Sequence, residues 1–173
     1  METKERREKI LEILKQEEKP LSATSLAKRF GVSRQIIVGD VALLRASGAD
    51  ISSTARGYVY RDESEKVPFG YVGMVPCRHG TDKLLAELCC VVDYGGCLID
   101  VIIEHPIYGQ ISGNLDISSR YDAEQFAARV KGGEGTPLSA LTDGIHIHHI
   151  GCRDKAVFRR IEHALLDLGI LLQ

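Results

Sequence analysis

The chain has 173 residues and a formal net charge of −2, with 22 Lys and Arg against 24 Asp and Glu. Basic side chains are concentrated at the start, because residues 1–61 contain 12 basic and 8 acidic side chains whereas residues 62–173 contain 10 and 16. The sequence lacks both the run of about 18 apolar residues that a membrane span requires and the apolar segment of a secretory signal, so we expect a cytoplasmic protein with no membrane partner.

The first elements are predicted to form a helix-turn-helix. A helix over residues 3–17 has apolar side chains at helical spacing. A second helix begins after Ser22 and ends at Gly31, and a third begins after Ser33, because serine caps the first turn of a helix and glycine commonly ends one. Two capped helices joined by a short turn containing glycine are typical of the helix-turn-helix.

Two short strands, 51–54 and 57–60, follow the third helix and predict a β-hairpin wing. Residues 1–62 are therefore predicted to form a winged helix-turn-helix domain. The charged segment 61–68 is typical of a solvated connection, and we predict a second domain over residues 68–173.

The start of the third helix carries side chains suited to reading DNA. Arg34 can donate two hydrogen bonds to guanine, and Gln35 can pair with adenine in a major groove. The net charge of +4 over residues 1–61 permits contact with phosphates without requiring it. The alternative is that this segment is only a capped, solvated helix start. We predict contacts with double-stranded DNA from Ser33, Arg34, Gln35, Val38 and Arg56, with Lys28 and Arg29 on phosphates.

Residues 68–173 alternate between strand and helix patterns in the order βαββαβα. This order predicts an antiparallel sheet with helices on one face, which gives the whole chain an α+β fold. The predicted elements are strands at 71–75, 97–103, 110–117 and 145–150 and helices at 82–92, 123–130 and 155–168.

The histidines of the second domain are its most informative feature. In the strand 145–150, His146 and His148 fall on one face, close enough for both imidazoles to bind one metal ion. His79 precedes the first helix of this domain and Glu87 lies within it, and both can face the end of a neighbouring strand. Three imidazoles and a carboxylate favour Zn, Ni or a similar divalent ion. The alternative for His79 and Glu87 is an ordinary surface histidine and a solvated helical glutamate.

Five cysteines, an odd number without Cys-x-x-Cys spacing, indicate neither a disulfide framework nor a thiolate zinc site. We expect them to be reduced, small, buried or half-buried residues. They are Cys77, Cys89, Cys90, Cys97 and Cys152.

Three segments, 79–88, 104–109 and 141–148, resemble the motifs of the 3H domain, and residues 31–40 resemble the helix-turn-helix found in front of it. Together they look like the niacin-responsive repressors, which shut down genes of NAD biosynthesis and niacin uptake when nicotinic acid is bound as corepressor. The resemblance implies an HPr-like βαββαβα fold and a homodimer on a palindromic operator. It also implies one divalent transition metal, Ni or Zn, per subunit, held by His79, Glu87, His146 and His148.

Two residues depart from the family pattern. Gly39 stands where a polar residue is expected in the recognition helix, and His149, which follows the paired histidines, can compete as a metal ligand. The effector site is not marked by a motif. Its candidates are Arg78, Lys83, His105 and Arg153, three cations and a histidine that could hold a carboxylate.

Two other functions are compatible with these residues. In one, the divalent ion itself is the signal and niacin adds nothing. In the other, the ion activates water for hydrolysis. We disfavour an enzyme because the sequence near the histidines has neither a nucleophile motif nor a glycine-rich phosphate loop.

Overall fold

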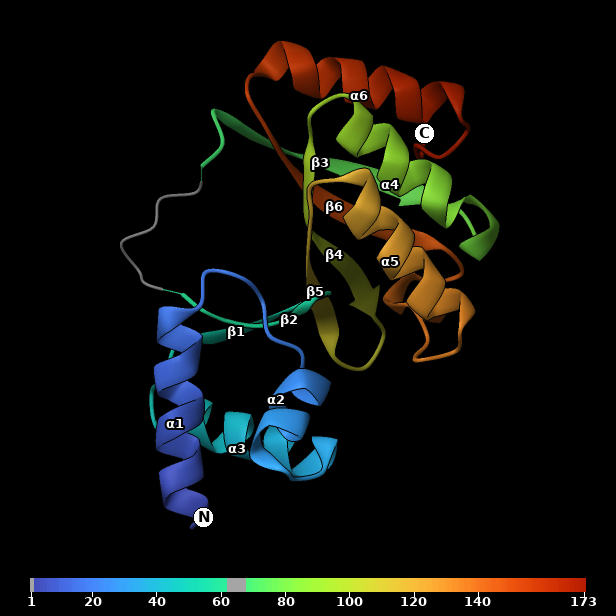
Figure 1. The fold of residues 1–173 in the computed structure, drawn as a ribbon. Helices are drawn as coiled ribbons and strands as arrows, with labels where there is room; N and C mark the ends of the chain where they lie inside the picture. Colours follow the sequence, from blue (N-terminus) through green and yellow to red (C-terminus); the bar gives the residue numbers. More distant parts are fainter. Residues whose placement is uncertain (1, 62–67) are drawn as a thin grey trace. The chain divides into compact units, whose positions relative to one another are not determined.

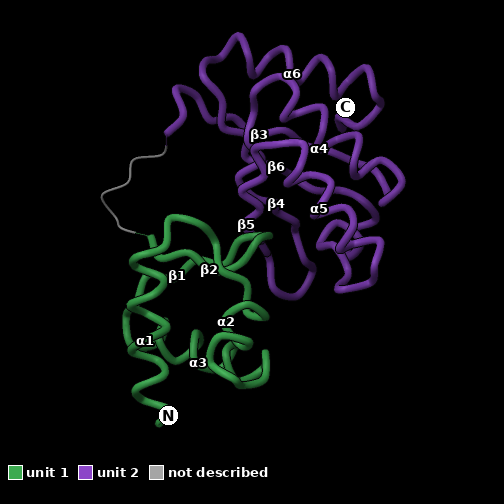
Figure 2. Tube along the Cα trace, in the orientation of Figure 1, with its two compact units in different colours: residues 1–67 green, residues 68–173 purple. Residues whose placement is uncertain are grey.

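The computed structural model describes residues 2–61 and 68–173, so the predicted connection at 61–68 falls largely outside the described residues. The chain divides into two compact units, residues 1–67 and residues 68–173 (Figure 2). None of the described helices is long and apolar enough to cross a lipid bilayer.

The first unit has the predicted order of three helices and a hairpin (Figure 1). Ser22 caps the second helix by accepting from the backbone N–H of Ser25, and Ser33 caps the third by accepting from that of Ile36. Gly31 ends the second helix at a φ of +64°. The elements are α1 (Thr3–Gln16), α2 (Ala23–Phe30), α3 (Arg34–Ala46), β1 (Ile51–Thr54) and β2 (Gly57–Tyr60).

A partly buried ion pair joins α1 to α3 inside this unit. Arg6 Nε donates to Asp40 Oδ2 at 2.6 Å and Arg6 Nη2 donates to Oδ1 at 3.2 Å, and the two side chains are 11% and 4% exposed. They lie beside a core of residues such as Ile10 and Ile37, both fully buried. The two residues are 34 positions apart, so no local sequence pattern predicts that they pair.

The wing is held to the helices by its backbone. Leu21 and Tyr58 exchange two backbone hydrogen bonds, of 2.9 and 2.8 Å, so the segment before α2 pairs with β2. A Cβ on Gly57 would lie 2.4 Å from the carbonyl carbon of Leu21, which explains why glycine stands there. Arg45, near the end of α3, donates to the carbonyl oxygen of Ile51 at 2.7 Å.

The second unit has the predicted βαββαβα order, with two short 3-10 turns, Thr81–Lys83 and Leu138–Thr142, added between elements. Its elements are β3 (Tyr71–Arg78), α4 (Leu84–Asp93), β4 (Cys97–His105), β5 (Gly109–Ile117), α5 (Arg120–Lys131), β6 (Ile145–Cys152) and α6 (Lys155–Asp167).

The four strands form one sheet in the order β3-β6-β4-β5, with every neighbouring pair antiparallel. The helices pack on one face of this sheet, as predicted. The core between them contains Leu88 and Val91 of α4, Ile150 of β6 and Ile161 and Leu165 of α6, all at most 1% exposed. The predicted α+β fold class is confirmed.

The first strand of this unit is three residues longer than predicted. The prediction ended it at Val75, and the next residue, Pro76, cannot donate a ladder hydrogen bond. The strand continues because β3 lies at the sheet edge, where Pro76 is still tolerated. The chain end runs along that edge, with the N–H of Leu172 donating to Pro76 O and that of Arg78 donating to Ile170 O, both at 2.9 Å.

Candidate metal centre and DNA interface

The strand register of the second unit brings the predicted metal ligands to one place. In the pairing of β3 with β6, Cys77 lies opposite His146 and Val75 lies opposite His148. All four are buried, so this face of the two strands points towards the helices. Glu87 of α4 is 1% exposed and lies over the same face.

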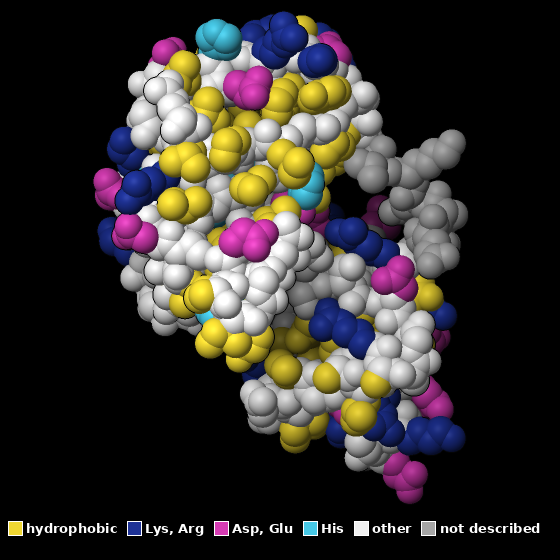
Figure 3. All heavy atoms as spheres, turned by 180° about the vertical axis from the view of Figure 1, so that it is seen from behind, with side chains coloured by type: hydrophobic (Ala, Val, Ile, Leu, Met, Phe, Trp, Pro, Cys, Tyr) yellow, Lys and Arg dark blue, Asp and Glu magenta, His cyan; other side chains and the backbone are white. Residues whose placement is uncertain are grey.

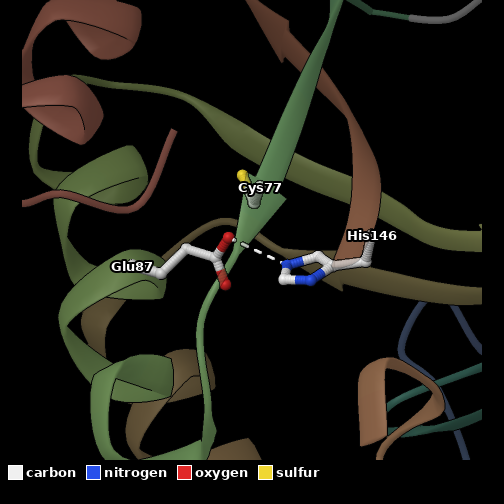
Figure 4. Close-up of side chains that lie close together, drawn as sticks. All are labelled: Cys77, Glu87 and His146. Atoms are coloured by element: carbon white, nitrogen blue, oxygen red, sulfur yellow. Dashed lines mark hydrogen bonds and ion pairs between the residues drawn. The ribbon is translucent and has the colours of Figure 1, made fainter. Parts of the chain in front are cut away.

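Three imidazoles converge on the carboxylate of Glu87. Its Oε2 lies 2.7 Å from His79 Nε2, and its Oε1 lies 3.1 Å from His146 Nε2 and 3.3 Å from His148 Nε2. The four side chains are between 1% and 4% exposed. Figure 4 shows Glu87 reaching from α4 towards His146 on β6, with Cys77 on β3 beside them. The structure therefore groups all four predicted ligands in one buried cluster.

Each of the three imidazoles has its other nitrogen on a backbone carbonyl. The Nδ1 atoms of His79, His146 and His148 donate to Gly80 O at 2.7 Å, Gly144 O at 2.8 Å and Asp100 O at 2.5 Å. Because a carbonyl oxygen only accepts, each Nδ1 carries the proton. When a metal ion displaces the proton from Nε2, the lone pair of that nitrogen would face the ion while Nδ1 stays on its carbonyl, which is the arrangement that metal-binding histidines require.

The cluster also shifts the pKa values of its members. Burial alone would raise the pKa of Glu87, but the charge of the nearby His148 and the hydrogen bonds from His146 and His79 hold it well below its ordinary value. Burial alone would lower the pKa values of His79 and His148, but the Glu87 carboxylate raises both. Without a metal, the cluster is therefore a buried carboxylate that favours protonated imidazoles.

One atom of this cluster is left without a hydrogen bond. His148 Nε2 lies 3.3 Å from Glu87 Oε1, but the two are not aligned for a hydrogen bond, and it is the one buried side-chain nitrogen or oxygen among the described residues that has no partner. An unsatisfied buried polar atom is costly and calls for an explanation. Three nitrogen donors and a carboxylate suit Ni or Zn, and a divalent ion would satisfy this atom. The residues present thus fit the predicted metal.

His149 lies apart from this cluster. Residues alternate between faces along β6, so His149 lies on the opposite face from His146 and His148. Its Nδ1 is 2.8 Å from Asp100 Oδ2, and its backbone N–H donates to Asp100 Oδ1. The structure therefore separates His149 from the residues with which it was expected to compete.

Cys77 is predicted from the sequence to be a packing residue only. All five cysteines are free, and they are buried or half-buried as predicted. The sulfur of Cys77, however, lies within 4.8 Å of ligand atoms of both Glu87 and His146. Burial, together with the neighbouring carboxylate, raises the pKa of the Cys77 thiol. The cross-strand position opposite His146 was the signal that could have found it, but it requires the strand pairing to be known.

The structure does not gather the four candidate effector residues. Arg78 pairs with Asp143 at 3.0 Å and precedes His79, and Lys83 donates to the carbonyl oxygen of Leu168. The remaining two are His105, which accepts from the N–H groups of the β4–β5 turn, and Arg153, which pairs with Asp154. Arg153 follows the end of β6 opposite to the one that pairs with Arg78, so these two cations do not share a pocket.

Most predicted DNA contacts are on the surface of the first unit. Arg34 and Gln35 are exposed in the first turn of α3, and Lys28 and Arg29 are exposed on α2. Ser33 is exposed too, although its hydroxyl oxygen already accepts from the N–H of Ile36. At the wing tip Arg56 is exposed, and its backbone N–H donates to Thr54 Oγ1.

Val38 was expected to be free for a partner, and the structure corrects this. It is half-buried and packs against the hydrophobic cluster of the first unit, because it follows the fully buried Ile37 and lies at the margin of the inner face of α3. The exposed face instead includes Ile36, 42% exposed, Gly39, and Leu43, 53% exposed. The exposed side of α3 is therefore more apolar than predicted.

A winged helix-turn-helix with an exposed recognition helix, followed by an antiparallel sheet domain, defines the class of DNA-binding regulators. Comparison with protein families assigns residues 6–59 to a helix-turn-helix domain and residues 73–173 to the 3H domain. The sequence is 37% identical to a probable transcription repressor NiaR of Thermotoga maritima, over 98% of this chain and 94% of that protein. It is 35% identical to the transcription repressor NadR of Bacillus subtilis, over 97% of this chain and 93% of that protein.

The chain therefore belongs to the family of 3H-domain transcription repressors. Like these relatives it is a DNA-binding transcription repressor and not an enzyme. The predicted family and the predicted class of function are confirmed.

Proposed function

We propose that this repressor controls genes of NAD biosynthesis and niacin uptake, with nicotinic acid as corepressor and one Ni or Zn ion per subunit. The ion would be held by His79, Glu87, His146 and His148. The observation that carries the metal is the convergence of three Nε2 atoms on one buried carboxylate, with His148 Nε2 left unsatisfied. The corepressor is supported by the motifs of residues 79–88, 104–109 and 141–148.

The metal ligands come from three parts of the second unit. His79 follows β3, Glu87 belongs to α4, and His146 and His148 belong to β6. When bound, a divalent ion would link these segments. The backbone carbonyls that accept from the three Nδ1 atoms keep the rings oriented in either state.

The first unit reads DNA through the start of α3. Arg34 and Gln35 contact base edges in the major groove, and the exposed Lys28 and Arg29 contact phosphates. The free N–H groups at the first turn of α3 also attract a phosphate. The wing adds a backbone contact through Arg56.

We further propose that the protein acts as a homodimer on a palindromic operator, with its two recognition helices about 34 Å apart. A second copy could dock on the outer face of the sheet, where apolar side chains gather on the side opposite the helices (Figure 3). Val72 and Met74 of β3 are 42% and 60% exposed there, and Ile145 of β6 is 42% exposed. Apolar patches of this kind are typical of subunit contacts.

Nicotinic acid would act by favouring the dimer whose helices match the operator. A coupling free energy of about 1 to 3 kcal/mol changes DNA affinity roughly 5- to 150-fold. Among the candidate cations, Arg78 is the nearest in sequence to a proposed ligand, His79. Its guanidinium can hold a carboxylate if its ion pair with Asp143 opens.

A second candidate is a repressor for which the metal ion alone is the signal. The dispersal of Arg78, Lys83, His105 and Arg153 favours it, because these residues are not gathered in one place, whereas the proposed metal ligands are.

One titration separates the two proposals. An operator is first selected from random duplex DNA, and its affinity is then measured by gel shift with chelator, with Zn or Ni, and with metal plus nicotinic acid. The corepressor proposal predicts a gain of at least about 5-fold on adding nicotinic acid to the metal-loaded protein. A gain on adding metal, followed by none on adding nicotinic acid, supports the second candidate instead. Equal affinity under all three conditions contradicts both.

A further inference from the structure

Cys77 lies beside the proposed metal ligands. It lies in β3, directly across from His146 in β6, and directly opposite residues of an antiparallel pair have Cβ atoms about 4.5 to 5.5 Å apart. Its side chain points to the same face, and its sulfur, an oxygen of Glu87 and a nitrogen of His146 all lie within 4.8 Å of one another. Figure 4 shows these three side chains together.

The charge of the site favours one more anionic ligand. A divalent ion with three neutral imidazoles and one carboxylate has a net charge of +1. The four side chains are at most 4% exposed, and an uncompensated charge at such a position is costly. A thiolate from Cys77 would bring the net charge of the site to zero.

The chemistry of sulfur also favours Cys77 as a ligand of these metals. Thiolates are among the strongest protein ligands for Zn and other late divalent metals, and a Zn–S bond of about 2.3 Å is longer than a Zn–N bond. Cys77 is fully buried, so its sulfur faces no water that could compete for the same position. When the sulfur–metal bond forms, the thiol proton leaves and the metal takes its place.

We propose that Cys77 is an additional metal ligand, which binds through its sulfur beside Glu87 and His146. This inference rests on the metal site of the proposed function and extends it by one residue that sequence reasoning had assigned to packing. The site then holds three nitrogens, one carboxylate and one sulfur, a set that selects a late transition metal over Mg or Ca.

The test uses the full chain loaded with Co(II), which replaces Zn and reports sulfur ligation by an intense thiolate-to-metal absorption band in the near ultraviolet. We expect this band in the wild-type protein. The variants Cys77→Ser and Cys77→Ala should lose it and should bind Co(II) at least about 10-fold more weakly in a calorimetric titration. Both variants are needed because serine keeps the size of the side chain and alanine avoids a buried hydroxyl.

Cys152→Ala is the matched control. Cys152 is also buried on the inner face of the sheet, at the end of β6 that pairs with Tyr71, and its sulfur lies 3.2 Å from Asp154 O. This variant should keep both the band and the affinity.

The outcomes separate this inference from the proposed metal site. If wild-type protein binds one Co(II) per chain without the sulfur band, or if Cys77→Ala keeps the band, Cys77 is not a ligand and the four-residue site stands. If wild-type protein binds no Co(II), Zn or Ni, both are overturned.

Discussion

The carbonyl oxygen of Gly144 accepts a hydrogen bond from Nδ1 of His146 at 2.8 Å. The same glycine lies against the neighbouring ligand, because a Cβ on it would come within 2.5 Å of the backbone oxygen of His79. The N–H of His79 also donates to Gly144 O at 3.3 Å. One glycine thus contacts the imidazole of His146 and the backbone of His79, and its φ of +83° is a conformation that other residues rarely adopt.

Gly144→Ala should therefore damage the metal site. The added methyl group must push the backbone of His79 away from Glu87, and we expect metal affinity to fall by about 10-fold or more, as for other residues that orient metal ligands. Calorimetric titration with Zn measures the loss.

Gly95→Ala is the control for backbone strain. Gly95 has the same φ of +83°, but a Cβ there meets no atom within 4 Å. We expect both variants to lose about 1 to 2 kcal/mol of stability from the left-handed conformation, and only Gly144→Ala to lose metal affinity. Unchanged affinity in Gly144→Ala would show that the loop before β6 adapts without moving His79.

Glu87→Gln should change how the stability of the metal-free protein depends on pH. Glu87 has a lowered pKa, so its stabilisation is present above its ordinary value of 4.5 and is lost as the pH falls below that value. His79 and His148 have raised pKa values, so their stabilisation is present below 6.5 and is lost as the pH rises through their folded-state values.

The chelated wild-type protein should therefore have its highest melting temperature in the mildly acidic range and a lower one above it. Glu87→Gln removes the charge that raises both histidine pKa values, so its melting temperature should fall less as the pH rises. Thermal unfolding in the presence of a chelator, repeated across this pH range, measures both curves. Parallel curves for the two proteins would contradict the assignment of these shifts to Glu87.

Some parts of this site could be predicted from local sequence patterns, and others could not. The two-residue period of a strand placed His146 and His148 on one face, and serine capping located α2 and α3, because these signals are local. Cys77 was not predicted as a neighbour of His146, because their contact depends on how β3 pairs with β6. Sequence position left His79 and Glu87 open to an ordinary surface role as well, and the family motifs favoured their place in the cluster.

In the first unit, too, local patterns were predictable and tertiary contacts were not. The apolar stripe of α1 was visible in the sequence, but the ion pair of Arg6 with Asp40 was not, because it forms only when α1 packs on α3. Val38 was misplaced for a related reason. The helical period alone does not show whether a residue at the margin of a buried face is exposed or buried. In the folded unit, Val38 packs against the core.

Asp40→Ala should destabilise the first unit because it leaves Arg6, whose side chain is only 11% exposed, without its partner. Removing one member of a buried, bidentate pair is strongly destabilising, and we expect the melting temperature of this unit to fall by about 10 °C or more. Amide hydrogen exchange within residues 3–60 measures the accompanying loss in the free energy of unfolding of this unit, separately from the second unit.

The matched control is Asp93→Ala, which breaks an equally short bidentate pair with Arg120. The two side chains of that pair are 40% and 63% exposed, and exposed pairs contribute little. Equal losses in the two variants would mean that burial does not determine the effect.

Arg34→Ala and Lys28→Ala should weaken DNA binding in different ways. Arg34 is proposed to contact a guanine edge, so its loss should reduce operator affinity by about 10- to 100-fold and relax the preference at one base pair. Lys28 is proposed to contact a phosphate, so its loss should weaken all duplexes alike and reduce the salt dependence of binding by about one ion. Gel shifts on operator and random duplexes at several salt concentrations distinguish them. An Arg34 variant that loses affinity equally for every duplex would place this side chain on the backbone.

Gly39→Ala tests why a glycine stands in the exposed face of the recognition helix. A Cβ there meets no atom of the chain within 4 Å, so nothing within the protein requires glycine, and alanine should stabilise the helix by about 1 kcal/mol. If the glycine serves close approach of α3 to the groove, the same methyl group should weaken operator binding, so that stability rises while affinity falls. Thermal unfolding and gel shifts on one preparation measure both quantities.

Ala42→Gly, at a neighbouring exposed position of α3, is the reverse control. It should lower the stability of the helix, and removing this methyl group should not increase operator affinity. A Gly39→Ala protein that is more stable and binds the operator as tightly as wild type would mean that this glycine only weakens the helix.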